Sequence, residues 1–302
     1  MKSRIHVGWK GLLAIVLSFA AQLAWATDRV ADDFLLKSEV VPHGPAANQV
    51  RVYGKEAGHG EYVVILPSLG RGVEDYTEQY HSTLVTRLVE AGYRVALIQP
   101  RGIGKSSGDL SPQKASMRMF VGDVKAVLDA LGVKRANFIG HGFGNRLART
   151  YATLYPDDVD HLVLMASGGK VKMNAEQKAC LANSFKLELP DEQRLRSVKC
   201  AFFAKKNDPS VWLTGWYPAL ARAQVHASKA IDGEFFEKAG GKPFLLLQAE
   251  EDFIAPPDKS GRVLKAELGD QVTYVEIPDA GHALSSEQPD SIASHIIDYF
   301  AK

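Results

Sequence analysis

The sequence has no excess of charge of either sign. Its 36 lysines and arginines are matched by 35 aspartates and glutamates, so the formal net charge is only +1. Binding to nucleic-acid phosphates requires a basic surface, and charged interaction tails consist of runs of like charge. Neither feature is present in the sequence, and we therefore expect no nucleic-acid partner.

Motifs for metals and cofactors are missing as well. Histidine, cysteine and carboxylate residues do not recur at the spacings that metal sites use. A glycine-dense loop over residues 99–108 contains Gly102 and Gly104, but Ser107 stands where a G-x-G-x-x-G motif needs its third glycine. We therefore expect a structural turn at this loop, and neither a metal nor a cofactor in the protein.

A long apolar run occurs at the N-terminus. Basic residues precede the run over residues 11–24, and Ala24 and Ala26 supply the small residues of a cleavage site. This order is typical of a secretory signal peptide, and the run is short for a transmembrane helix. We predict a signal peptide over residues 1–26. The mature chain, 27–302, would then be periplasmic or secreted, with no stable membrane anchor.

Cysteine is scarce, because Cys180 and Cys200 are the whole set. Export would make a disulfide between them chemically possible. Two separate buried thiols are consistent with the same sequence. Both alternatives stay open at this point.

Strand and helix signals alternate along the mature chain. An antiparallel start around a turn at 42–45 is followed by apolar runs typical of strands buried on both faces. Strands are expected at residues 34–41, 49–53, 62–67, 93–98, 162–166, 243–249 and 272–277, and helices at 76–91, 116–131, 257–268 and 289–300. Together with one more strand and helix described below, this alternation predicts an α/β fold with a mostly parallel, doubly wound sheet.

The strand pattern stops between about residues 168 and 241. This region has helical rather than strand signals and is predicted to be a cap over the C-terminal ends of the strands, where open α/β sheets bind ligands. It is rich in aromatic residues, among them Trp212, Trp216 and Tyr217. These side chains suggest an apolar or aromatic ligand, although packing within the cap accounts for them equally well.

The segment Gly140-His141-Gly142-Phe143-Gly144 predicts a sharp turn between an apolar strand and a helix. Its outer glycines allow the strand and the helix to approach closely. This is the sequence shape of a nucleophile elbow, G-x-S-x-G, with Gly142 where the serine would stand. The position therefore lacks the atom that would attack a carbonyl carbon.

Three other segments accompany this turn. Leu66–Gly70 follows the third predicted strand, Glu250–Pro256 follows the strand at 243–249, and Pro278–His282 follows the strand at 272–277. In this order the four segments resemble a capped α/β-hydrolase over nearly the whole mature chain. They also resemble a group of exported bacterial members in which alanine or glycine commonly fills the nucleophile position.

The resemblance implies a histidine–acid pair. His282 would act as the catalytic base, and Gly281 would allow its loop the backbone freedom to reach the turn. Asp252 would accept the ring N–H of His282 and so fix the tautomer of the imidazole. Glu250 and Glu251 are rivals for the acid, but the position before Phe-Ile-Ala-Pro favours Asp252.

The resemblance also implies an oxyanion hole made by the backbone N–H of Phe143 and that of Ser68 or Leu69. Such donors need no side chain and would survive the loss of the nucleophile. Ser68 is in addition a conceivable displaced nucleophile. His141 is more often a packing residue at this family position. Candidate substrate contacts are His141, Trp212, Trp216 and Tyr217.

Two functions remain in view. The first is hydrolysis of a small, apolar carbonyl or ester compound by non-covalent general-base catalysis through His282 and Asp252. The second is a non-catalytic pocket that only binds a small-molecule ligand, because a fold does not decide between catalysis and binding. The retained histidine–acid pair favours the enzyme.

Overall fold

The computed structural model describes residues 30–168 and 172–302. The predicted signal peptide, residues 1–26, lies outside the described residues. Within the described ranges, no helix is both long and apolar enough to span a bilayer.

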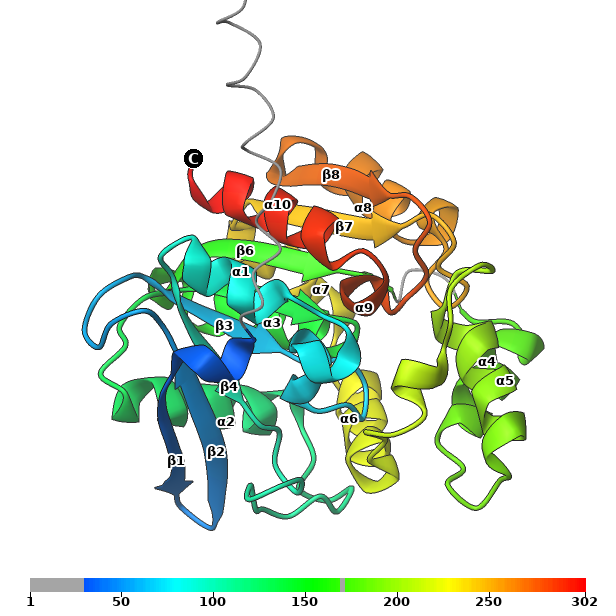
Figure 1. The fold of residues 1–302 in the computed structure, drawn as a ribbon, viewed down its shortest axis with the longest axis horizontal. Helices are drawn as coiled ribbons and strands as arrows, with labels where there is room; N and C mark the ends of the chain where they lie inside the picture. The colour runs from blue at the N-terminus through cyan, green and yellow to red at the C-terminus, as the bar shows by residue number, and fades with distance from the viewer. Residues whose placement is uncertain (1–29, 169–171) are drawn as a thin grey trace, which may run out of the picture.

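One eight-stranded sheet runs through the molecule (Figure 1). Its spatial order is β1-β2-β4-β3-β5-β6-β7-β8, with β1 and β2 antiparallel to their neighbours and the other strands parallel. The strands are β1 (Leu35–His43), β2 (Ala46–Tyr53), β3 (Tyr62–Leu66), β4 (Arg94–Ile98), β5 (Ala136–His141), β6 (Val159–Met165), β7 (Phe244–Ala249) and β8 (Val272–Ile277). The predicted α/β fold with a mostly parallel, doubly wound sheet is confirmed.

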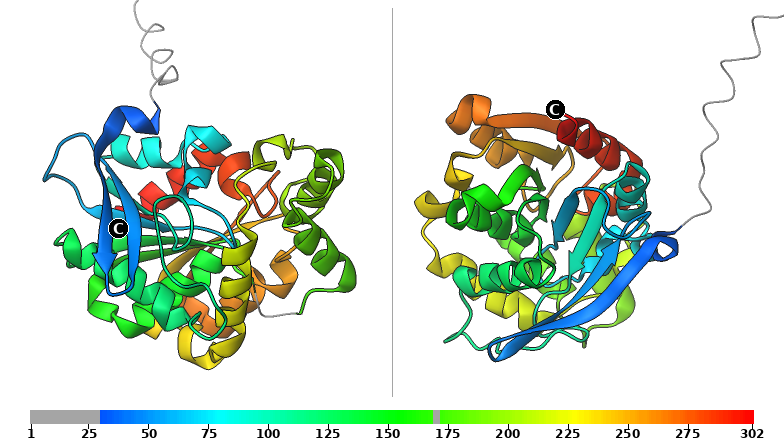
Figure 2. Two further views of the ribbon diagram at one scale, coloured as in Figure 1. Left: turned by 90° about the horizontal axis from the view of Figure 1, so that it is seen from below. Right: turned by 90° about the vertical axis from the view of Figure 1, so that its left-hand side faces the viewer.

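Helices cover both faces of this sheet (Figure 2). The α-helices are α1 (Leu84–Glu90), α2 (Met117–Ala130), α3 (Phe143–Leu154), α4 (Ala175–Ser184), α5 (Asp191–Phe202), α6 (Pro218–Ala230), α7 (Gly233–Phe236), α8 (Gly261–Leu268), α9 (Leu284–Glu287) and α10 (Pro289–Phe300). The 3-10 helices are η1 (Ala31–Phe34), η2 (Val73–Tyr76), η3 (Glu78–Tyr80), η4 (Pro156–Asp158), η5 (Ser210–Trp212), η6 (Ala239–Gly241), η7 (Pro257–Lys259) and η8 (Gly269–Gln271).

The alternation of side chains along β3 separates two cores. Val64 and Leu66 pack with residues of α2 and α3, whereas Val63 and Ile65 pack with residues of α1 and α10. All four side chains are buried, as expected for a parallel strand covered on both faces. The C-terminal ends of the central strands are therefore held rigidly, and the loops that follow them start from fixed positions.

One predicted helix is wrong over half its length. The region 76–91 contains η2, η3 and only a short α1, because His81 adopts a left-handed backbone with φ of 58°. The fully buried Tyr76 turns its hydroxyl toward His141, so tertiary packing overrides the helical spacing of the apolar residues. This irregular segment brings Tyr76 to the end of β5.

The segment between β6 and β7 is helical, as predicted. Helices α4 and α5 form a cap-like pair on the side toward which β7 and β8 point (Figure 1). Cys180 of α4 and Cys200 of α5 form a disulfide with 5.9 Å between their Cα atoms. Of the two alternatives left open by the sequence, the structure has the disulfide.

Candidate active site

The turn between β5 and α3 is built on close backbone contacts. A Cβ on Gly140 would lie 2.4 Å from the carbonyl oxygen of Gly144, and one on Gly144 would lie 2.0 Å from that of Leu66. Between them Gly142 has φ of 55° and ψ of −107°, a conformation that costs strain in residues with a Cβ. The three glycines therefore allow β3, β5 and α3 to meet at backbone distance.

His282 and Asp252 form a buried pair beside this turn. His282 Nδ1 lies 2.9 Å from Asp252 Oδ2 and 3.1 Å from Oδ1. Because a carboxylate only accepts, this contact places the ring proton on Nδ1 and leaves a lone pair on Nε2. Nε2 lies 3.2 Å from the position that a Cβ on Gly142 would occupy. The basic nitrogen is thus directed at the turn.

Asp252 is distinguished from its two rivals by burial and bonding. Glu250 and Glu251 are exposed at the end of β7, whereas Asp252 is 2% exposed. Asp252 also accepts a hydrogen bond from the backbone N–H of Ala255 at 2.8 Å, and one from Gln248 Nε2 at 3.2 Å. These donors fix the carboxylate plane against the imidazole of His282.

The loop that carries His282 is fastened to the cap. The N–H of Gly281 donates to Glu287 Oε2 at 2.7 Å, and Glu287 Oε1 accepts from Ala204 N and Asn207 Nδ2, each at 2.8 Å. Burial is the largest influence on Glu287 and raises the pKa of its carboxyl. Glu287 therefore links the histidine loop to the segment that follows α5.

Gly281 has a different role from the one expected. Its Cβ would lie 2.6 Å from the carbonyl oxygen of Phe202, so no side chain fits there. The N–H of Ala283 donates to the same oxygen at 2.8 Å. The glycine thus permits close backbone packing rather than freedom of the loop.

Two backbone amides are available as oxyanion donors. Phe143 is the first residue of α3, and Leu69 follows β3; both line a cavity next to Gly142. Across residues 30–168 and 172–302, neither N–H has a hydrogen-bond acceptor. The positive end of the α3 dipole adds to the attraction for developing negative charge.

Ser68 and Leu69 were the two alternatives for the second oxyanion donor, and both line the cavity. The Ser68 backbone lies near the Tyr76 hydroxyl and lowers the pKa of Tyr76 against the larger, raising effect of burial.

His141 was predicted as a candidate substrate contact, and the structure places it elsewhere. Its side chain is 0% exposed, with Nδ1 3.1 Å from the Tyr76 hydroxyl and Nε2 2.8 Å from the main-chain carbonyl of His282. Burial lowers the pKa of His141 to about 3. Both ring nitrogens are used within the protein, so His141 supports the histidine loop.

Trp212, Trp216 and Tyr217 are likewise not brought to the cavity. The two tryptophans stack on the guanidinium of Arg71, with its Cζ 4.3 Å and 4.5 Å from their ring centroids. Arg71 is fully buried and forms a two-pronged ion pair with Asp75 at 2.6 Å and 2.8 Å. Tyr217 packs against the core next to α2 and α3. Packing within the cap accounts for these aromatic residues.

A cavity of about 730 Å³ opens beside the histidine and the two amides. Its inner wall includes Ser68, Gly142, Phe202 and His282. A neighbouring cavity of about 880 Å³ shares Leu69 and several cap residues with it. The combined space is large enough for a small organic molecule.

Positive side chains surround these cavities. Those of the first are Arg146, Lys172, Lys178 and Lys229, and the second adds Lys186 and Arg222. Among the described lining residues the only carboxylate is Glu188. The walls are otherwise mainly apolar, with Leu69, Leu181 and Val225 among them.

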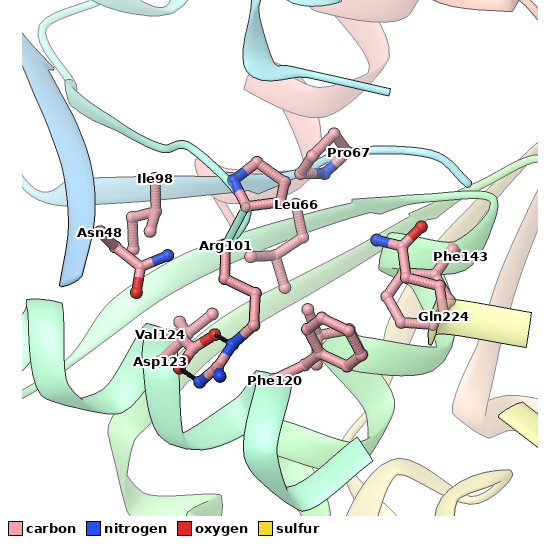
Figure 3. A pocket seen from close by; sticks show the side chains of 12 residues that line it. Asn48, Leu66, Pro67, Ile98, Arg101, Phe120, Asp123, Val124, Phe143 and Gln224 are labelled. Carbon is pink, nitrogen blue, oxygen red and sulfur yellow. Dashed lines mark hydrogen bonds and ion pairs between the residues drawn. The ribbon is translucent and has the colours of Figure 1, made fainter. Parts of the chain in front are cut away.

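A much smaller cavity of about 30 Å³ lies under the loop that follows β3 (Figure 3). Arg101 points toward Asp123 there and forms a buried ion pair with it. Gln224 of α6 accepts from the N–H of Gly70 at 2.7 Å, which ties the cap to this loop. The space is large enough for a water molecule, and the hydrogen bonds around it support the loop.

Several supporting residues escaped the sequence analysis. Arg71, Gln224, Gln248 and Glu287 all hold the site in place, and all of them except Gln248 do so through residues far away in the chain. A glutamine or glutamate in a helix or strand carries no local signal for such a contact. Gln248 alone offered a hint, because a polar residue inside the apolar run of β7 needs a buried partner.

A family model described as serine aminopeptidase, S33, matches residues 63–289, about three quarters of the chain. The chain belongs to this α/β-hydrolase family.

Curated relatives of this α/β-hydrolase include hydrolases named for 2-hydroxy-6-oxo dienoate and dienedioate compounds. It is 32% identical over 118 residues to the 2-hydroxy-6-oxo-6-phenylhexa-2,4-dienoate hydrolase of Comamonas testosteroni, covering 39% of the chain and 40% of that relative. It is 25% identical over 270 residues to a 2-hydroxy-6-oxononadienedioate/2-hydroxy-6-oxononatrienedioate hydrolase of a Pseudomonas species, covering 83% of the chain and 92% of the relative. The chain thus spans less than half of the first and nearly all of the second.

Solved structures show the same fold. The enol-lactonase of Burkholderia xenovorans LB400 superimposes with a TM-score of 0.70 at 20% identity, covering 87% of this α/β-hydrolase and 100% of the other chain. A bromoperoxidase of Bacillus anthracis gives a TM-score of 0.70 at 18% identity, covering 88% and 100%. At these identities the likeness extends to the fold alone.

Proposed function

We propose that this protein hydrolyses small carbonyl or ester compounds by a non-covalent mechanism, with His282 as the general base. The observation that carries the proposal is the position of His282 Nε2, held by Asp252 and directed at a cavity that is also lined by Leu69 and Phe143. Gly142 has no hydroxyl, so no acyl-enzyme can form at the turn. Water is then the nucleophile.

The proposed reaction uses three groups of the chain. A substrate carbonyl binds with its oxygen at the N–H groups of Phe143 and Leu69, and a water molecule lies between its carbon and His282. His282 takes a proton as the water attacks, the two amides stabilise the oxyanion, and the imidazolium then returns the proton to the leaving group. Asp252 stabilises the imidazolium during this interval.

The cavity supports a substrate with an apolar body and an anionic group. Its walls are mainly apolar, while Lys172, Lys178 and Lys229 are exposed at its edge. The names of the two curated relatives describe dienoate and dienedioate substrates, which are carboxylates. A small 6-oxo acid or a carboxylate ester combines these properties.

The competing function is ligand binding without turnover, and Gly142 is the observation that favours it. A family fold without a hydroxyl at the turn retains a cavity and its donors, and these suffice to bind a carbonyl compound. Catalysis and binding differ in what His282 does, so a substitution of His282 separates them.

The test is a turnover assay on short-chain activated esters and 6-oxodienoates, each with and without a terminal carboxylate. We expect turnover by the natural chain and a loss of about 10²–10⁴-fold in His282→Ala, with ligand affinity in calorimetry nearly unchanged. His59→Ala, at an exposed loop position, is the matched control. Binding without turnover by the natural chain would establish the competing function.

We also propose that the protein is exported and that its mature chain begins at Thr27. The N-terminal residue pattern supports this proposal, and so does the Cys180–Cys200 disulfide, since such bonds persist in oxidising compartments.

A further inference from the structure

Two side-chain atoms, Ser68 Oγ and His282 Nε2, lie close to the position that a side chain on Gly142 would occupy. An ideal Cβ on Gly142 would lie 2.5 Å from Ser68 Oγ and 3.2 Å from His282 Nε2. A distance of 2.5 Å is too short for two unbonded heavy atoms of this kind. The hydroxyl of Ser68 therefore already fills part of the volume that a side chain at the turn would take.

The backbone of Ser68 is held in place while its hydroxyl is not. The N–H of Arg71 donates a hydrogen bond to Ser68 O at 3.2 Å, which fixes the peptide group after Ser68. Within the described parts of the chain, Ser68 Oγ has no hydrogen-bond partner, although the residue is only 1% exposed and lines the cavity. A hydroxyl that lines a cavity and has no protein partner is available to a water molecule or a ligand.

We propose that Ser68 Oγ, reaching across from the loop after β3, holds the attacking water against His282 Nε2 in place of a hydroxyl on the turn. This inference rests on the proposed function and identifies the group that orients its nucleophile. The water donates one proton to the lone pair of Nε2 and bonds to Ser68 Oγ through its other proton or its lone pair. Its oxygen attacks the carbonyl carbon of a substrate bound at the Leu69 and Phe143 amides.

Every bond in this step is accounted for. A C–O bond forms between the water and the substrate, one water O–H bond breaks, and its proton moves to His282 Nε2. The tetrahedral intermediate then collapses, the bond to the leaving group breaks, and the leaving group takes the proton from His282. Ser68 forms no covalent bond and changes no bond of its own.

The first test compares three variants with the natural chain under steady-state conditions. Ser68→Ala should lower kcat about 10- to 100-fold with little change in KM, because it removes one hydrogen bond to a developing hydroxide. Ser68→Thr, which keeps the hydroxyl, should recover most of the loss. Ser184→Ala, a buried serine of α4 outside both cavities, should match the natural chain. Natural kcat in Ser68→Ala, with His282→Ala inactive, would overturn the inference and leave the proposed function standing.

The second test does not depend on turnover. A high-resolution crystal structure should contain an ordered water within hydrogen-bond distance of both Ser68 Oγ and His282 Nε2, and the same water should be absent from Ser68→Ala crystals. Absence of that water from the natural protein would overturn the inference, whether or not the protein is an enzyme. Labelling of Ser68 by a fluorophosphonate probe would overturn it too, because Ser68 would then itself be the nucleophile.

Discussion

The ring of His141 donates a hydrogen bond to the main-chain carbonyl of His282, with 2.8 Å between Nε2 and O. A carbonyl only accepts, so Nε2 carries the proton and Nδ1 accepts from the Tyr76 hydroxyl at 3.1 Å. The buried imidazole is neutral, since burial lowers the pKa of His141 to about 3. His141 and Tyr76 thus hold the backbone of the His282 loop in place, although neither residue lines the cavity.

This neutral histidine predicts a loss of stability in acid. Between pH 6.5 and pH 3 the unfolded chain protonates His141 while the folded chain does not, so the free energy of unfolding falls by up to about 1.4 kcal/mol per pH unit. His141→Gln should be less stable at pH 7, but its stability should fall less between pH 6.5 and pH 4. Urea unfolding at several pH values measures both slopes. His59→Gln controls for the loss of an exposed imidazole, and parallel slopes in the natural chain and His141→Gln would contradict the prediction.

The disulfide between α4 and α5 predicts a redox-dependent stability. Cys180 and Cys200 are 20 residues apart, and closing a loop of that size contributes roughly 3 kcal/mol. A reducing agent should lower the thermal midpoint of the natural chain. A double variant, Cys180→Ala with Cys200→Ala, should start at the lower midpoint and not respond to the reductant. If the reductant lowered the thermal midpoint of both proteins equally, the change would not be caused by the Cys180–Cys200 disulfide and the prediction would be wrong.

Arg71 is predicted to be the residue that fastens the cap to the loop after β3. Arg71→Lys keeps the charge but loses the planar stacking on Trp212 and Trp216 and the two-pronged bond to Asp75, so we expect about 1.5–3 kcal/mol less stability. Trp212 and Trp216 form an aromatic cage around Arg71. They are the only tryptophans in residues 27–302, so their fluorescence reports directly on this cage. A red-shifted emission at pH 7 in the folded variant is expected. Unchanged emission and stability would show that the cage holds without the guanidinium.

The sequence predicted the elements that depend on local signals. Strand β8 and helix α10 begin and end where expected, because Pro289 is favoured at the first turn of a helix and the apolar run of β8 ends before a Pro-Asp turn. The spacing of 76–91 predicted too long a helix, because a backbone turn at His81 and burial of Tyr76 depend on contacts with β5.

Residues that act over long distances in the chain could not be predicted in the same way. Composition cannot tell an aromatic ligand site from an aromatic cage, and the partner that decides it, Arg71, lies far from Trp212 in sequence. The positions of His282 and Asp252 followed from a family resemblance. The hydroxyl of Ser68 beside the ideal Cβ position of Gly142 emerged only from the three-dimensional arrangement.

Export makes a prediction about the N-terminus. Mature protein recovered from the periplasm or the medium should begin at Thr27, because cleavage is expected after Ala26. Ala24→Leu with Ala26→Leu removes both small residues and should leave the precursor uncut. Edman sequencing and intact mass distinguish the two forms, and recovered exported protein that still carries Met1 would contradict the prediction.

A pair of substitutions, Gly142→Ser and Ser68→Gly, transfers the hydroxyl from the loop after β3 to the turn after β5. Gly142→Ser places a Cβ at φ of 55° and within 2.5 Å of Ser68 Oγ, so the variant should be less stable by roughly 1–3 kcal/mol and should displace the Ser68 side chain. Adding Ser68→Gly to it removes the steric conflict and leaves only the backbone strain. The double variant should therefore regain part of the stability and present its new hydroxyl to His282 Nε2.

Fluorophosphonate labelling measures the outcome. The natural chain and Ser68→Gly alone should remain unlabelled, since neither has an activated serine at the turn. The double variant should be labelled at position 142, and faster than Gly142→Ser alone, because nothing then competes for the space beside His282. A folded double variant that stays unlabelled would mean that His282 and the Leu69 and Phe143 amides are not placed to activate a hydroxyl at the turn. The proposed general base would then lose its geometric support, and ligand binding would become the better account of the cavity.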